Sequence, residues 1–86
     1  MRVAILYRPN SEYARIVETY AHDLLKQHQI KSDIMSLDSR EGAAFASLYD
    51  ITAYPAIMAL ADDGQVLKDW TGPELPLMRE VSSYVR

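Results

Sequence analysis

The chain has 86 residues, of which 49% are hydrophobic and 24% are charged, and its formal net charge is −3. This length and balance predict one globular domain over residues 1–86 and leave too little chain for a second core. The nine lysines and arginines are scattered along the sequence. No cationic stripe is therefore available to follow a phosphate backbone, and we expect no nucleic-acid partner.

Membrane proteins and thiol enzymes are both excluded by what the sequence lacks. No apolar run approaches the roughly 20 residues that span a bilayer, and the first apolar stretch is too short for a signal peptide. We therefore expect no membrane partner and a cytoplasmic location. The absence of cysteine rules out disulfides, thiolate metal sites and thiol nucleophiles. Because His22 and His28 fall on different faces of one predicted helix, we expect neither a metal site nor a cofactor.

The first two predicted elements are a buried strand and an amphipathic helix. Residues 2–7 form a nearly continuous apolar run, which is typical of a central strand covered on both faces. After a break at Pro9, either Asn10 or Ser11 is placed to cap a helix. The helix is predicted by apolar residues that recur at helical spacing and form one stripe: Tyr13, Ile16, Val17, Tyr20, Ala21, Leu24 and Leu25.

A second strand is predicted over residues 30–38, followed by a second helix that continues through Tyr49. Asp38 and Glu41 have the spacing of a capping box at the start of this helix. Ser39 is the alternative cap for the same helix.

A hairpin and a last helix complete the chain. Residues 54–61 and 66–70 predict two strands joined by a turn at Gly64. Alternation along the second of them places Val66, Lys68 and Trp70 on one face, where Trp70 is expected to pack on the sheet. The last helix is predicted to begin at Pro76. Its expected buried residues are Leu77, Met78, Val81, Tyr84 and Val85.

The predicted order is therefore βαβαββα, which belongs to the α/β class. The first βαβ unit requires two parallel strands joined by a right-handed crossover. The later hairpin adds two antiparallel strands. We expect a four-stranded mixed sheet with helices on both faces.

Two segments resemble the glutaredoxin/thioredoxin-like family. Residues 6–14 (Leu-Tyr-Arg-Pro-Asn-Ser-Glu-Tyr-Ala) are similar to the segment in which a strand ends in Tyr, a basic residue and Pro before Cys-Pro-Tyr-Cys. On this match Ser11 and Ala14 stand where the nucleophilic and resolving cysteines belong, and Arg8 stands for the basic residue that helps hold the glutathione carboxylate. Residues 49–57 (Tyr-Asp-Ile-Thr-Ala-Tyr-Pro-Ala-Ile) resemble the run that leads to a cis proline, here Pro55.

A third segment matches the family less well. Thr71-Gly72-Pro73-Glu74 lies where glutaredoxins carry Gly-Gly and an acidic pair that binds the amine end of glutathione. Here the second glycine is missing and Glu74 is the only acid, which weakens the expectation of glutathione binding. The resemblance covers essentially the whole chain, and it implies a thioredoxin-like fold that lacks both active-site cysteines.

Each candidate site residue also has a purely structural interpretation. Ser11 is interpreted as a helix cap rather than a nucleophile, because its hydroxyl is a weak acid and no histidine is near in sequence to act as base. Arg8, Tyr13 and Tyr54 would converge, on the family geometry, around an anion or a peptide carboxylate. The alternative makes both tyrosines core aromatics and Arg8 a solvated charge. No catalytic constellation is found, so an enzyme is not expected.

The leading functional hypothesis is a redox-inactive domain that binds a peptide or protein partner at the former active-site groove, where the backbone of Tyr54 would pair with an extended chain. One alternative is noncovalent binding of glutathione or another small thiol. The other is a structural or assembly module. The candidate binding residues are Arg8, Ser11, Tyr13, Ala14, Tyr54, Pro55, Gly72 and Glu74.

Overall fold

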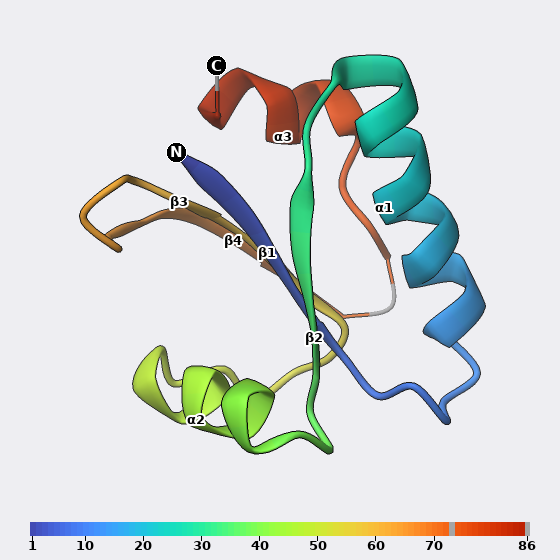
Figure 1. Ribbon diagram of the computed structural model, residues 1–86, viewed down its shortest axis with the longest axis vertical. Helices are drawn as coiled ribbons and strands as arrows, with labels where there is room; N and C mark the ends of the chain where they lie inside the picture. The colour runs from blue at the N-terminus through green and yellow to red at the C-terminus, as the bar shows by residue number, and fades with distance from the viewer. Residues whose placement is uncertain (73, 86) are drawn as a thin grey trace.

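The structure, a computed structural model, describes residues 1–72 and 74–85. Along the chain its elements are β1 (Arg2–Tyr7), α1 (Ala14–His28), β2 (Ser32–Ser36), α2 (Arg40–Leu48), β3 (Ala56–Leu60), β4 (Val66–Thr71) and α3 (Met78–Tyr84). The predicted order βαβαββα is confirmed. The four strands form one sheet in the order β2-β1-β3-β4, seen from one edge in Figure 1.

The apolar run at the start of the chain becomes an interior strand. β1 pairs in parallel with β2 and antiparallel with β3, and β3 pairs antiparallel with β4, so the sheet is mixed as predicted. The residues of β1 from Val3 to Tyr7 are buried. A strand covered on both faces has no place for exposed polar side chains, which is why this run does not alternate.

Side chains on the two faces of β1 belong to two separate cores. Val3, Ile5 and Tyr7 pack with residues of α1 and α3. Ala4 and Leu6 pack on the other face, with α2 and the loop that follows it. Figure 1 shows α1 and α2 on opposite sides of the sheet, so the prediction of helices on both faces is confirmed.

The helix α1 differs from its predicted form at its start and along its stripe. It begins at Ala14 after Tyr13, which makes no side-chain capping bond, so the prediction that Asn10 or Ser11 caps it is wrong. The Ser11 hydroxyl donates instead to the carbonyl oxygen of Arg8 at 2.7 Å, because that oxygen lies at the closing position of a tight turn. Within the apolar stripe, Ile16 and Leu25 are exposed.

The helix α2 is capped by the second of its two candidates. Ser39 accepts a hydrogen bond from the backbone N–H of Gly42 at 3.0 Å, so the expected capping box of Asp38 and Glu41 is not the cap. The first turn lies directly against the end of β2. A Cβ at Gly42 would be 1.9 Å from the carbonyl oxygen of Ser36, which means that only glycine fits there.

Three other boundaries are corrected. β2 is limited to Ser32–Ser36 rather than residues 30–38, and β3 begins at Ala56 rather than Tyr54. The last helix begins at Met78 rather than Pro76, because the backbone of Leu77, the residue before it, is extended.

A β-bulge in β4 overturns the predicted alternation of that strand. Ala59 is opposite Lys68 whereas Leu60 is opposite Val66, so Leu67 is an extra residue in the ladder. Val66 therefore packs in the core beside α2 while Trp70 packs in the core beneath α1. The prediction that Val66 and Trp70 share a face is wrong, but Trp70 does pack on the sheet.

Candidate functional site

The site is built from two loops that the sheet brings together. β1 and β3 are antiparallel neighbours with Leu6 opposite Ala56, so the end of β1 and the start of β3 meet at the same edge. The loop after β1 contributes residues 8–13, and the loop before β3 contributes residues 49–55. Segments that are some 40 residues apart in the sequence therefore face each other because of strand pairing alone.

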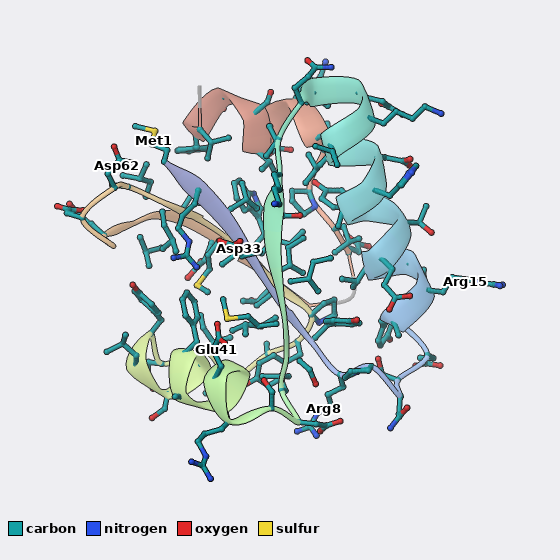
Figure 2. All side chains as sticks on the ribbon, in the orientation of Figure 1. Met1, Arg8, Arg15, Asp33, Glu41 and Asp62 are labelled. Carbon is teal, nitrogen blue, oxygen red and sulfur yellow. The ribbon has the colours of Figure 1, made fainter. Side chains whose placement is uncertain are left out.

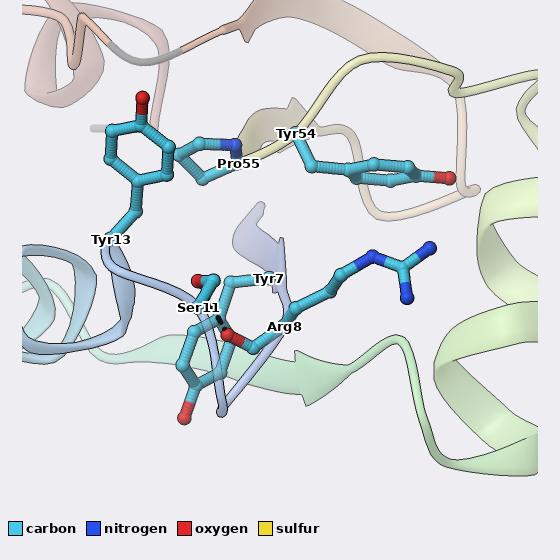
Figure 3. A pocket seen from close by; sticks show the side chains of 6 residues that line it. All are labelled: Tyr7, Arg8, Ser11, Tyr13, Tyr54 and Pro55. Atoms are coloured by element: carbon cyan, nitrogen blue, oxygen red, sulfur yellow. Dashed lines mark hydrogen bonds between the residues drawn. The ribbon is translucent and has the colours of Figure 1, made fainter.

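A pocket of about 280 Å³ lies between these loops, and we call it the Ser11 pocket. It is lined by Tyr7, Arg8, Ser11, Tyr13, Tyr54 and Pro55. Figure 3 shows Tyr13, Pro55 and Tyr54 in a row along one side, with Ser11 and Arg8 on the other. The structure thus brings together five of the eight sequence-derived site residues.

Tyr7 lines the pocket although sequence reasoning had assigned it only to the strand. Its hydroxyl donates to a carboxylate oxygen of Glu18 on α1 at 2.9 Å. Burial raises the pKa of Tyr7, and the hydrogen bond and negative charge of Glu18 raise it further, so the phenol stays protonated. Tyr7 therefore supplies a neutral aromatic wall. The signal for it in the sequence was its place in the segment of residues 6–14, as the Tyr that ends the strand.

Arg8 brings a positive charge to the site. Its side chain is 62% exposed, and one guanidinium nitrogen lies 3.9 Å from a carboxylate oxygen of Asp38. An exposed pair at that distance contributes at most about 1 kcal/mol, so the guanidinium remains available to an anion. Figure 2 shows Arg8 at the end of β1 near α2, whereas Arg15 on α1 points away.

A second pocket, of about 400 Å³, lies on the other side of Arg8, and we call it the Thr52 pocket. Arg8 and Tyr54 line both pockets, so these two residues form the boundary between them. The other lining residues come from the end of β2, from α2 and from the loop after it: Leu37, Ala43, Ala46, Ser47, Asp50, Ile51 and Thr52. Sequence reasoning missed these residues, because only tertiary packing places Leu37 beside Thr52.

The backbone at the boundary is held in place and partly unpaired. The Tyr54–Pro55 peptide bond is cis, and the Tyr54 hydroxyl donates to the carbonyl oxygen of Ile51 at 2.8 Å. The Pro55 carbonyl accepts from the N–H of Gly72 at 3.0 Å. Among the hydrogen bonds within residues 1–72 and 74–85, none involves the backbone N–H or C=O of Tyr54.

The other three sequence-derived residues lie elsewhere. Ala14 is the first residue of α1 and packs against the core beneath that helix. Gly72 has its N–H bonded to Pro55 and lines neither pocket, and Glu74 is exposed and lines neither. Pro73, which the glutathione comparison also used, lies outside the described residues. Gly72 and Glu74, the described residues matched to the amine end of glutathione, are therefore not part of either pocket.

The polar side chains that line the Ser11 pocket are one guanidinium, one hydroxyl and three phenols. The Ser11 hydroxyl is bonded to the Arg8 carbonyl, and no histidine lines the Ser11 pocket. Within residues 1–72 and 74–85, no group of three or more acidic or histidine side chains is arranged to hold a metal ion. No helix in the described part of the chain is long and apolar enough to cross a membrane.

Comparisons with known proteins identify the fold. Neither a family model nor a curated protein sequence matches the chain. Among solved structures, thioredoxin 1 from Thermosipho africanus TCF52B matches with a TM-score of 0.71 and 10% sequence identity, over 99% of this chain and 90% of that one. At this identity the similarity shows the fold alone. The fold is thioredoxin-like, and the chain carries no cysteine on it.

Proposed function

We propose that this domain binds an extended peptide segment of a partner protein, noncovalently and without redox chemistry. The observation that carries the proposal is the unpaired backbone of Tyr54, which lies at the boundary of two adjacent pockets. An extended peptide can add main-chain hydrogen bonds at such a position, and alternate side chains then enter neighbouring pockets.

The lining of the pockets supports a particular kind of segment. The Ser11 pocket has aromatic walls from Tyr7, Tyr13 and Tyr54, which suits an apolar or aromatic side chain. The guanidinium of Arg8 between the pockets suits an acidic side chain or a terminal carboxylate. Because these 86 residues contain no thiol, binding here is proposed to leave the partner's own disulfides and thiols unchanged.

The experiment is selection of binders from a phage-displayed random peptide library on the immobilised domain. Selected peptides are expected to lose at least about tenfold in affinity for Arg8→Glu, since removing one partner of a charge-assisted contact costs about 1.5–3 kcal/mol. Tyr54→Ala is expected to have a similar effect. Arg15→Glu is the matched control, because it makes the same charge change at a side chain that points away from both pockets.

Two results would overturn the proposal. One is a library that yields no specific binder, and the other is a set of binders indifferent to both Arg8→Glu and Tyr54→Ala. Titration with glutathione, followed by amide chemical shifts, tests noncovalent thiol binding separately. Shifts at Arg8, Tyr54 and Gly72 would favour that alternative over peptide binding, and unchanged spectra would exclude it.

A further inference from the structure

The two edges of the sheet are not equivalent. The β4 edge is interrupted by the bulge at Leu67, whereas β2 pairs with β1 through five consecutive partners without a shift. Bulges are one means by which edge strands avoid pairing with other chains, and a regular edge strand lacks that protection. In Figure 1 β2 lies in front of β1, and neither α1 nor α2 crosses it.

The direction of the free backbone groups on β2 follows from one hydrogen bond. The N–H of Leu37 donates to the carbonyl oxygen of Tyr7 on β1 at 2.9 Å. Because backbone groups alternate in direction along a strand, odd-numbered residues of β2 bond to β1 and even-numbered residues point to the open edge. Ser32 and Ile34 therefore offer their N–H and C=O groups to a further strand. Ser36 offers only its N–H, because its carbonyl oxygen already accepts a hydrogen bond from the N–H of Ser39 at 3.1 Å.

An apolar groove of about 290 Å³ runs beside this edge, between α1 and β2. Its lining residues are Glu18, Ala21, His22, Leu25, Lys31, Ser32 and Ile34. Two large apolar side chains of the groove are exposed, Leu25 by 51% and Ile34 by 42%. Both would be removed from water by a partner that pairs with β2.

The charges of the groove are arranged so that it complements a copy of itself. Glu18 marks one end, since it accepts a hydrogen bond from Tyr7 at the end of β1. Lys31 marks the other end, immediately before the first residue of β2. A twofold rotation about an axis through Ile34 exchanges the two ends, so Lys31 of a second copy approaches Glu18 of the first.

We propose that this face is an interface between two copies of the chain, in which β2 pairs antiparallel with β2 of the second copy. The twofold axis passes through Ile34, which then lies opposite its own copy, and Ser32 lies opposite Ser36. In this register the N–H and C=O of Ile34 pair with those of its copy, and the C=O of Ser32 accepts from the N–H of Ser36 of the second copy. A register centred on Asp33 is disfavoured, because it would place two carboxylates directly opposite each other.

Sedimentation equilibrium over a concentration series tests the interface. The unmodified chain is expected to show a reversible monomer–dimer equilibrium, and Ile34→Lys is expected to sediment as a monomer. Leu67→Lys is the matched control, because Leu67 is exposed to a similar degree, 38%, on the opposite edge. An unmodified chain that stays monomeric, or a dimer that survives Ile34→Lys, overturns the proposal.

Charge exchange tests the orientation of the two copies. Glu18→Lys and Lys31→Glu are each expected to weaken dimerisation about fivefold, because each change affects two symmetry-related pairs of modest strength. The double variant Glu18→Lys with Lys31→Glu is expected to recover the affinity. Additive weakening in the double variant contradicts the antiparallel arrangement.

A single cysteine tests the position of the axis without depending on charge. Because the chain has no native cysteine, Ile34→Cys places one thiol at the proposed twofold. Opposed Cα atoms of a hydrogen-bonded antiparallel pair are about 5.5 Å apart, within the range that a disulfide spans. Oxidised glutathione is expected to convert Ile34→Cys to a covalent dimer faster than Leu67→Cys. Equal rates for the two variants contradict the proposal.

Discussion

The hydroxyl of Tyr20 on α1 donates a hydrogen bond of 2.7 Å to the carbonyl oxygen of Pro76, just before α3. This bond joins the last segment of the chain to α1, although the two residues are 56 positions apart in the sequence. Burial, and secondarily the negative charge of Glu80, raises the pKa of Tyr20 to about 12. The phenol therefore remains a hydrogen-bond donor at every pH near neutrality.

Tyr20→Phe is expected to lower the free energy of unfolding by about 1 kcal/mol, because it leaves the Pro76 carbonyl without its donor. Urea denaturation at neutral pH measures this change. Tyr84→Phe is the matched control on α3, since the Tyr84 hydroxyl is in no side-chain hydrogen bond found among the described residues. It is expected to change stability by less than about 0.5 kcal/mol.

The raised pKa of Tyr20 also predicts a dependence of stability on alkaline pH. The folded-state pKa of about 12 exceeds the ordinary value of 10.0, so the stabilisation is complete below pH 10 and is lost as pH rises through 12. Tyr20→Phe is expected to lose stability less steeply over this interval, measured by urea midpoints. Identical slopes for the two proteins would contradict the assignment. Some slope persists in the variant, because the pKa of Tyr7 is raised as well.

The two candidate caps of α2 can be separated by parallel substitutions. Ser39→Ala is expected to cost about 1 kcal/mol of stability, because it removes the acceptor for the Gly42 N–H. Asp38→Ala is expected to cost less than about 0.5 kcal/mol, since Asp38 is exposed and only loosely paired with Arg8. Thermal unfolding measures the loss of stability in both variants. A larger loss for Asp38→Ala than for Ser39→Ala would show that Asp38, and not Ser39, caps α2.

Gly42→Ala reverses the usual effect of this substitution in a helix. Alanine at a helical glycine ordinarily stabilises by up to about 1 kcal/mol. Here the added Cβ would be 1.9 Å from the Ser36 carbonyl oxygen. The free energy of unfolding is therefore expected to fall by about 2 kcal/mol or more, because the backbone of α2 or β2 must shift to make room. Urea denaturation measures whether the free energy of unfolding falls or rises. A rise would contradict the close contact between Gly42 and the end of β2.

The placement of Ser11 and Ala14 can be checked by restoring thiols. The N–H of Ala14 bonds to the carbonyl of Ser11 at 3.2 Å, so one turn joins the two residues. Ser11→Cys with Ala14→Cys is expected to form an internal disulfide and to reduce insulin in the presence of dithiothreitol. Ser11→Cys alone is the control and is expected to be much less active. An accessible but inert dithiol would argue against the match to the family motif.

The sequence predicted the arrangement of elements well, because that arrangement depends on patterns local to each element. The apolar run of β1 and the helical spacing of α1 are both such patterns. It predicted helix starts poorly, because several polar residues near each start compete and only packing selects one. At α2, for example, the contact between Gly42 and the end of β2 places Ser39 as the cap.

The candidate site was predicted in part for a similar reason. Arg8, Ser11, Tyr54 and Pro55 belong to short motifs, so a resemblance could locate them. The Thr52 pocket combines residues of the 49–57 motif with Leu37 and with residues of α2 that belong to no motif, so only the folded chain shows that these segments meet. The bulge at Leu67 likewise breaks the period-two pattern by a single residue, which alternation by itself cannot reveal.

That extra residue at Leu67 lets one short strand serve two hydrophobic layers at once. Val66 closes the layer beside α2, while Trp70 closes the layer beside α1 and meets Tyr84 edge-on at 5.7 Å. Opening β4 therefore exposes both layers together, so this edge strand should resist the independent fraying that edge strands commonly show. Hydrogen exchange of those β4 amides that bond to β3 is expected to follow global unfolding.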